Sequence, residues 1–214
     1  MSDPAPTPDG TAAQLVAAGL KLFGRKGFAA TSTREIAAEA GTNVASISYH
    51  FGGKDGLRRA CGAEVARRIG AAIGSAAPAL PHSADAADRQ MEAILRAMVA
   101  FVAGTRDNDD LTAFMLREVG ENGPVLDAVY DTMIDPMHRR LCALWAVATG
   151  QEAESETTRL VVFTLVGQAL YFRVGRPIVT RRMGWDALGP AEADRIADIL
   201  VANLHSILAR ERLT

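Results

Sequence analysis

Apolar side chains recur along this chain at helical spacing, and glycine and proline divide the repeats into segments. In the segment 11–26, Val16, Leu20 and Phe23 fall at i, i+4 and i+7, and Gly27 follows as a stop signal. No segment shows the sustained apolar/polar alternation of a half-buried strand. The pattern therefore predicts an all-α fold.

The same spacing predicts helices to the end of the chain. Pro136 is expected to kink or break one of them, because proline removes a hydrogen-bond donor and clashes one turn back. The Ala/Pro-rich stretch 76–83 is predicted to link two domains. The predicted helices lie at about 11–26, 33–40, 44 to 49 or 50, 54–75, 84–105, 110–121, 124–149, 155–175 and 190–212.

The composition favours a globular protein without catalytic or metal-binding motifs. With 214 residues, 49% of them hydrophobic, the chain is long enough to bury a sizeable core. Cys61 and Cys142 stand in separate stretches without metal-ligand spacing, so we expect buried or half-buried free thiols, no metal and no cofactor. The histidines at 50, 82, 138 and 205 are scattered, and no phosphate-loop, HExxH or GxSxG pattern occurs, which argues against an enzyme.

No stretch has the pattern of an export signal or a membrane span. Residues 1–10 lack the charged-then-apolar layout of a signal peptide. The most apolar run, 160–174, has about 15 residues and includes Gln168 and Arg173, whereas a span needs about 20. We therefore expect a cytoplasmic protein with no membrane partner.

Charge is unevenly distributed. The net charge is −2 overall, but residues 1–75 hold nine Lys/Arg against six Asp/Glu, while the rest holds 14 against 19. The first part is therefore basic by three charges and the remainder acidic by five. This modest basic excess is compatible with nucleic-acid binding near the N-terminus.

Two short helices and a tight turn are signalled locally in the basic part. Ser32 and Glu35 form a capping box, in which the hydroxyl accepts from the N3 amide and the carboxylate reaches back. Gly41 supplies the left-handed residue that a tight turn needs, and Asn43 is a good N-cap for the next helix. Two short helices joined in this way are the layout of a helix-turn-helix.

The stretch 28–57 resembles the DNA-binding signature of the TetR family of transcriptional regulators. It is the central part of a resemblance that extends over about 45 residues. It is carried by Gly27-Phe28, the Thr/Ser run before Arg34-Glu35-Ile36-Ala37, Ala40-Gly41, Ile47 to Phe51, and Lys54. It implies a three-helix, helix-turn-helix DNA-binding domain at 11–56, with a helix at 54–75 that connects it to the rest of the chain.

Helical spacing divides the two short helices into an inner and an outer face. The residues at inward spacing, which are expected to lock the helices at a fixed angle, are Ile36, Ala37, Ala40, Ile47 and Phe51. The residues left to project from the second of them are Val44, Ala45, Ser46, Ser48 and Tyr49. Few of these side chains can contact a base in a bidentate manner, so specificity is expected to rest on a few contacts and on DNA shape.

Lys54 stands in the first turn of a predicted helix, where the macrodipole opposes a cation by about 0.3 to 1 kcal/mol. A DNA phosphate would offset this cost, and a solvated surface lysine is the alternative. The resemblance implies that Thr33, Arg34 and Tyr49 also contact the DNA backbone. His50 either donates to a phosphate or caps a helix end. The candidate DNA contacts are Thr33, Arg34, Asn43, Val44, Ala45, Ser46, Ser48, Tyr49, His50 and Lys54.

The second half of the chain resembles the C-terminal domain of the YbiH/CecR-type subgroup of TetR regulators. The resemblance is carried by Leu116-Arg117-Glu118, Pro124, Pro136, Leu165 to Gln168, Tyr171 to Arg173, Arg182 and Gly184-Trp185. It implies a ligand-responsive dimer and does not name the ligand.

Two predicted helices carry more apolar surface than one protomer needs. The helix at 155–175 is apolar nearly all round, so one face is expected to pack inside the protomer and the other on a partner. The last helix has a broad stripe expected to complete a four-helix interface between two chains, formed by Ile196, Ile199, Leu200, Asn203, Leu204, Ile207 and Leu208. Ordinary intrachain packing of both helices is the alternative.

Methionines and aromatic residues at helical spacing suggest an adaptable apolar pocket, although each of them alone also fits an ordinary core. Arg117 would pair either with an anionic group of a ligand or with a carboxylate such as Glu118 or Glu121. The candidate ligand-binding residues are Met91, Leu95, Met98, Phe114, Met115, Arg117, Tyr130, Met133, Met137, Trp145, Gln168 and Tyr171.

Together these patterns predict a helical ligand-binding and dimerisation domain at 84–214 behind the DNA-binding domain. The function that the resemblance implies is a ligand-responsive repressor that binds a palindromic DNA operator as a homodimer and is released by a small apolar or amphipathic molecule. The residues themselves do not distinguish repression from activation. A helical interaction module that does not bind DNA is the alternative.

Overall fold

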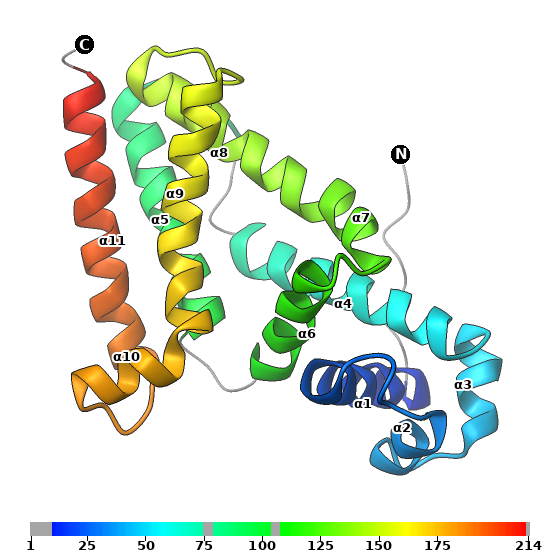
Figure 1. The fold of residues 1–214 in the computed structure, drawn as a ribbon. Helices are drawn as coiled ribbons and strands as arrows, with labels where there is room; N and C mark the ends of the chain where they lie inside the picture. The colour runs from blue at the N-terminus through cyan, green and yellow to red at the C-terminus, as the bar shows by residue number, and fades with distance from the viewer. Residues whose placement is uncertain (1–9, 75–78, 104–107, 213–214) are drawn as a thin grey trace. The chain divides into compact units, whose positions relative to one another are not determined.

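In the computed structural model, which describes residues 10–74, 79–103 and 108–212, helices account for all the regular secondary structure (Figure 1). The all-α prediction is confirmed. The chain forms two compact units, which we describe separately: the first unit comprises Met1–Arg68 and Asp107–Thr132, and the second comprises Ile69–Arg106 and Met133–Thr214. No described helix combines the length and the apolarity that crossing a bilayer requires.

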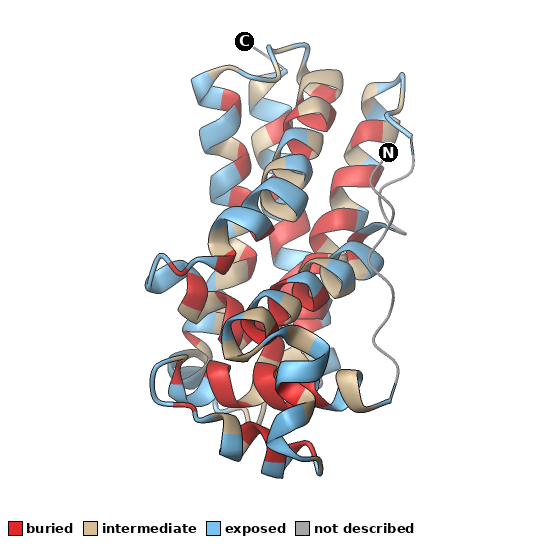
Figure 2. Ribbon diagram, turned by 90° about the vertical axis from the view of Figure 1, so that its right-hand side faces the viewer, coloured by how far each residue is buried: buried red, intermediate tan, exposed pale blue. Residues whose placement is uncertain are grey.

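The first unit is built around the helix-turn-helix segment. Its helices are α1 (Thr11–Lys26), α2 (Thr33–Glu39), α3 (Val44–Phe51), the larger part of α4 (Lys54–Gly74), α6 (Asp109–Gly120) and α7 (Val125–Val129). Its core contains side chains that are at most 1% exposed, among them Leu15, Phe23, Ile36, Ile47, Leu57 and Phe114. Figure 2 shows such buried residues on the helix sides that face neighbouring helices.

A close backbone approach joins α6 to α1. A Cβ atom at Gly24 would lie 2.9 Å from the carbonyl oxygen of Asp110 and 3.0 Å from the amide nitrogen of Phe114, so a larger residue would push the helices apart. Beside this contact, the rings of Phe23 and Phe114 lie 6.3 Å apart between centroids. Helix α6 therefore packs as part of the first unit, although it lies far from α1 in the sequence.

The second unit contains α5 (Ala84–Ala103), α8 (Asp135–Thr149), α9 (Glu156–Val174), α10 (Arg176–Met183) and α11 (Pro190–Glu211). One core cluster gathers Met91, Leu95, Trp145 and Leu204 from α5, α8 and α11. A second cluster joins Val99, Ala169, Leu188 and Leu200. The interior of this unit is therefore apolar and draws on every long helix.

The interruption predicted at Pro136 takes the form of a π-helical turn, η2 (Tyr130–Ile134), between α7 and α8. Proline has no N–H to donate and would crowd the carbonyl one turn back, and a wider turn before it relieves both problems. The hydroxyl of Thr132 donates to the carbonyl oxygen of Ala128 at 2.6 Å within this segment. The backbone hydrogen-bonding pattern is therefore π-helical over the five residues of η2 and becomes α-helical again in α8.

Most predicted helices agree with the structure to within a few residues, but α10 was not predicted. Its residues are all exposed or half-buried, so no buried stripe marks it in the sequence. The predicted ends at 75 and 105 and part of the linker at 76–83 lie outside the described residues. Cys61 and Cys142 are buried free thiols, as expected.

Candidate nucleic-acid interface

The start of α2 is fixed by the predicted capping box. The Oγ atom of Ser32 accepts from the backbone N–H of Glu35 at 3.2 Å, and the Glu35 carboxylate accepts from the backbone N–H of Ser32 at 2.8 Å. The ammonium group of Lys26 donates to the same carboxylate at 2.6 Å. The Lys26 and Ser32 hydrogen bonds lower the pKa of Glu35 to about 2. The capping carboxylate is therefore ionised at neutral pH.

The turn between α2 and α3 has the predicted chemistry. Gly41 has a φ of 63°, in the left-handed region that favours glycine. Asn43 is the N-cap of α3, and its side-chain oxygen accepts from the backbone N–H of Ser46 at 3.0 Å. The Thr42 and Ser46 hydroxyls lie 3.0 Å apart. These bonds set the angle at which α3 leaves α2.

Burial divides α3 into the two predicted faces. Ile47 is 1% exposed, whereas Tyr49 is 85% exposed and Val44 is 41% exposed. Ala45, Ser48 and His50 are also exposed, and Ser46 is half-buried. The outer face of α3 is therefore open, while the inner face is locked in the core.

The remaining predicted DNA contacts lie at the ends of α2 and α4. Arg34 is exposed and Thr33 is half-buried, both in the first turn of α2. Lys54 is the first residue of α4, and its Nζ atom lies 4.2 Å from the centroid of the Phe28 ring. Sequence reasoning did not find this ring as the neighbour of Lys54, because the two residues are separated by α2 and α3.

A buried ion pair joins α4 to α6 in the same unit. The Nε atom of Arg58 lies 2.7 Å from a carboxylate oxygen of Glu118, and the two side chains are 10% and 4% exposed. The Arg58 guanidinium also lies 4.4 Å from the centroid of the Phe28 ring. Arg58 was not among the predicted functional residues, and Glu118 was considered only as a partner of Arg117.

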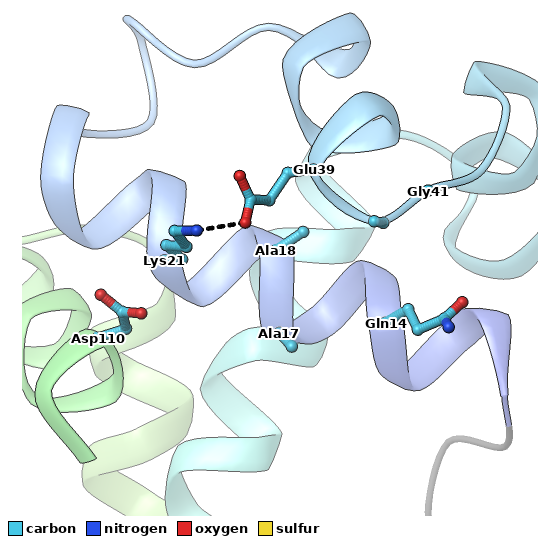
Figure 3. A pocket seen from close by; sticks show the side chains of 8 residues that line it. Gln14, Ala17, Ala18, Lys21, Glu39, Gly41 and Asp110 are labelled. Atoms are coloured by element: carbon cyan, nitrogen blue, oxygen red, sulfur yellow. Dashed lines mark hydrogen bonds and ion pairs between the residues drawn. The ribbon is translucent and has the colours of Figure 1, made fainter. Parts of the chain in front are cut away.

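The first unit also has an open hollow of about 460 Å³. Lys21 forms an ion pair with Glu39 across it, as Figure 3 shows. The hollow is lined by Gln14, Ala17, Ala18, Lys21, Glu39, Ala40, Gly41 and Asp110. This lining shares no residue with the predicted DNA-binding or ligand-binding sets.

The structure divides the predicted ligand-binding residues between the two units. Phe114, Met115, Arg117 and Tyr130 belong to the first unit. Those in the second unit are Met91, Leu95, Met98, Met133, Met137, Trp145, Gln168 and Tyr171.

Of those in the second unit, Met91, Leu95, Met98 and Trp145 are buried together with the half-buried Met137 packed against them. The structure therefore brings these five residues together.

Several of the other candidates already have partners or lie at the surface. Arg117 pairs with Glu121 at 3.1 Å, which agrees with the ion-pair interpretation made from the sequence. Gln168 accepts a hydrogen bond from Asn203 at 2.8 Å. Tyr130 is 48% exposed and Tyr171 is 53% exposed.

Burial in the second unit corrects the stripe predicted on the last helix. Ile196, Leu200, Leu204 and Leu208 are at most 4% exposed and belong to intrachain cores, so their assignment to a surface between chains is wrong. Ile199, by contrast, is 63% exposed. The difference arises because α11 turns its broadest apolar face towards α5.

Helix α9 has an exposed apolar face as well as a buried one. Val162, Leu165 and Ala169 are buried within the unit. On the other side, the exposed apolar side chains are Leu160 (57%), Phe163 (54%), Tyr171 (53%) and Val174 (63%). The predicted burial of one face inside the protomer is therefore confirmed, and packing of the other face on a partner stays a prediction.

A capped helix, a glycine turn and a second capped helix with an open outer face define a helix-turn-helix protein, here followed by an all-helical C-terminal part. Comparison with protein families identifies two matches. Residues 15–61 match the bacterial regulatory proteins of the TetR family, and residues 87–210 match the C-terminal domain of the HTH-type transcriptional dual regulator CecR.

Individual proteins agree with these matches. The chain is 36% identical, over an alignment of 220 positions, to the HTH-type transcriptional dual regulator CecR of Shigella flexneri. The alignment covers 97% of this chain and 96% of that protein. It is 29% identical over 121 residues to the probable transcriptional regulator YttP of Bacillus subtilis, covering 56% of each. The chain belongs to the TetR family of transcriptional regulators, and its C-terminal part is of the CecR type.

Solved structures share the fold at low sequence identity. A TetR-like transcriptional regulator from Rhodococcus sp. RHA1 superposes with a TM-score of 0.73 at 19% identity, covering 95% of this chain and 98% of that one. AibR in complex with isovaleryl coenzyme A and operator DNA superposes with a TM-score of 0.68 at 18% identity, covering 90% and 96%. The two-part helical architecture is therefore that of the family.

Proposed function

We propose that this chain is a ligand-responsive repressor that binds an inverted-repeat operator as a homodimer. The observation that carries the proposal is the division of α3, in which Ile47 is 1% exposed while Tyr49 is 85% exposed. A short helix held by one face and open along the other fits the width of the DNA major groove.

In this proposal the outer face of α3 reads the bases. Ser48 and the side chains of Val44 and Ala45 offer a hydroxyl and small apolar groups, which suit single hydrogen bonds and contacts to thymine methyl groups. Asn43 and Ser46 use their polar atoms within the turn, so their DNA contacts are expected to be at its edge.

Backbone contacts come from the residues around α3. Thr33 and Arg34 lie at the N-terminus of α2 and Lys54 at the N-terminus of α4, where helix dipoles favour a phosphate. Tyr49 and His50 follow on the exposed side of α3, with their rings 4.9 Å apart. We propose that these five residues fix the register of the protein on the duplex.

The dimer is proposed to form through α9 and α11. Leu160 and Phe163 on α9 and Ile199 on α11 are each more than half exposed, and apolar side chains that gather on one exposed surface mark protein–protein interfaces. Pairing of these faces would bury them in a four-helix interface with two-fold symmetry. Two-fold symmetry then requires half-sites whose centres are about 34 to 36 Å apart, or a multiple of this.

The effector is proposed to be a small apolar or amphipathic molecule that binds among residues 91–171. The interior of the second unit supplies Met91, Met98 and Met137, which are adaptable side chains suited to loosely specified apolar ligands. AibR, which shares the fold, binds isovaleryl coenzyme A, so an acyl thioester is one class to test. The proposed division of labour is DNA binding at 11–56, connection at 54–75, and ligand binding with dimerisation at 84–214.

An inducer releases DNA only if it binds the DNA-free arrangement more tightly than the DNA-bound one. By linkage, operator DNA must then lower the affinity for the inducer by the same factor. We favour repression, because a protein bound to an operator most simply blocks transcription of the adjacent genes. The relative in Shigella flexneri is described as a dual regulator, so activation of some genes is the alternative outcome.

Mapping the sites that the chain occupies in its own genome tests the proposal. Cells carrying the wild-type chain are compared with cells carrying Tyr49→Ala, which alters an exposed residue of α3. Enriched inverted repeats that disappear with the variant, together with raised transcription of the adjacent genes, support a repressor. Absence of enrichment for the wild type would mean that the chain does not act on DNA, and lowered transcription would assign activation.

A further inference from the structure

We infer that Phe28 is a positioning residue that holds the ammonium group of Lys54 ready for a DNA phosphate. The inference rests on the proposed DNA-binding function and adds a role for a ring that contacts no base or phosphate in that proposal. The ring belongs to the turn between α1 and α2, and Lys54 begins α4.

Two cations lie against this ring. The Nζ atom of Lys54 is 4.2 Å and the guanidinium carbon of Arg58 is 4.4 Å from its centroid. Both distances are well inside the 6 Å range of cation–π attraction. Lys54 and Arg58 are one helical turn apart, so α4 presents both charges on the same side.

The two cations differ in what neutralises them. The charge of Arg58 is balanced by the buried carboxylate of Glu118, 2.7 Å away. Among the residues that the structure describes, no carboxylate forms an ion pair with Lys54. The Phe28 ring is therefore the attractive neighbour of the ammonium group, and a ring face leaves the N–H donors of that group available for a phosphate.

The Phe28 ring is itself fixed by a residue of the core of the first unit. Its centroid is 5.5 Å from that of Phe23, which is 1% exposed in the core of the first unit. A lysine side chain otherwise loses much rotamer freedom when it is fixed by a ligand. Because Phe28 fixes the ammonium before DNA arrives, part of that loss is removed from the binding step.

The test replaces Phe28 by fluorinated phenylalanines in the full-length chain. Adding one, two and three ring fluorines weakens cation–π attraction stepwise while the shape of the ring is nearly kept. The probe is a mixed-sequence DNA duplex of about 40 base pairs at low salt, because a phosphate contact does not depend on the operator sequence. Affinity is expected to fall stepwise, by about tenfold for the trifluorinated ring in a dimer that uses two such contacts.

Two controls separate positioning from packing. The same substitutions at Phe172, which packs against the second core cluster and belongs to none of the proposed contact sets, should leave DNA affinity within about twofold. In a Lys54→Met background, fluorination of Phe28 should have no further effect, because the cation is gone. Circular dichroism and thermal unfolding verify that each variant is folded.

Each outcome has a distinct meaning. A stepwise loss at Phe28 that vanishes with Lys54→Met supports the inference. Unchanged affinity along the Phe28 series, while Lys54→Met weakens binding, would overturn the positioning role and leave the DNA-binding proposal intact. A loss that persists in the Lys54→Met background would show that Phe28 acts through Arg58 or through packing, and would overturn the positioning of Lys54. Failure of the wild type to bind the duplex would instead overturn the proposed function.

Discussion

Removal of the Glu118 carboxylate should destabilise the first unit by about 3 kcal/mol in free energy of unfolding. Its partner Arg58 is 10% exposed and would be left as a buried charge without a counter-ion. Breaking a buried pair from one side costs roughly 3 to 5 kcal/mol. We take the lower end, because one Glu118 oxygen is buried without a hydrogen-bond partner and so weakens the pair at the start.

A three-variant series gives this prediction its control. Glu118→Leu leaves Arg58 unpaired, Arg58→Met leaves Glu118 unpaired, and the double variant replaces both charges by apolar groups of similar length. Each single variant should lose about 3 kcal/mol, whereas the double variant should lie within about 1 kcal/mol of the wild type.

Urea unfolding followed by circular dichroism measures these changes, with the slope of the transition checked for each variant. A loss below about 1 kcal/mol in the single variants would show that the pair behaves as an exposed one. A double variant as unstable as the sum of the singles would show that packing, and not charge, carries the effect.

Four further outcomes are expected from the structure. Ser32→Ala removes the N-cap of α2 and should cost about 1 kcal/mol of stability in the same urea assay, so an unchanged midpoint would deny the cap its role. Tyr49→Ala should weaken DNA binding without loss of helical content, since the side chain is 85% exposed, and unfolding of the variant would place Tyr49 in the core. Lys54→Ala should reduce the salt slope of DNA binding by roughly one unit per protomer, and a changed sequence preference at constant slope would contradict a phosphate contact. Ile199→Glu should give folded monomers in analytical ultracentrifugation, whereas Leu204→Glu, at a position with 0% exposure, should unfold the second unit, and a folded Leu204→Glu monomer would refute the assignment of that residue to the core.

The helix-turn-helix was predictable because its signals are local. A capping box needs residues three positions apart, and the turn needs one glycine and one asparagine, so Ser32, Glu35, Gly41 and Asn43 could be read directly. The inner positions of α2 and α3 follow from helical spacing, and Ile36 and Ile47 are indeed at most 1% exposed. Local chemistry and burial agree in this segment, which is why prediction succeeded.

The errors arose where the sequence does not show which neighbouring helix covers an apolar helix face. The stripe on α11 is apolar whichever helix covers it, so spacing alone did not reveal that Leu204 packs inside the protomer and that Ile199 remains exposed. Helix α10 has no buried stripe at all, and Pro177 in its first turn and Gly184 at its end were the available signals.

Contacts between segments that are far apart along the chain could not be predicted from the sequence either. Arg58 and Glu118 are 60 positions apart, and their pairing depends on how α6 packs in the first unit. The same holds for Phe28 and Lys54, which meet because α2 and α3 fold back between them. The predicted ligand-binding residues show the same limit, since methionine-rich spacing describes a core and a pocket equally well.

Selection of DNA sequences from a random pool by the full-length chain tests the central claim most directly. The account predicts enrichment of an inverted repeat whose half-site centres are about 34 to 36 Å apart, or a multiple of this, with enrichment lost for Tyr49→Ala. Enrichment of a direct repeat would contradict the two-fold symmetric dimer. Recovery of no preferred sequence would contradict sequence reading by the exposed face of α3, and an equal enrichment by Tyr49→Ala would contradict a DNA contact by that residue.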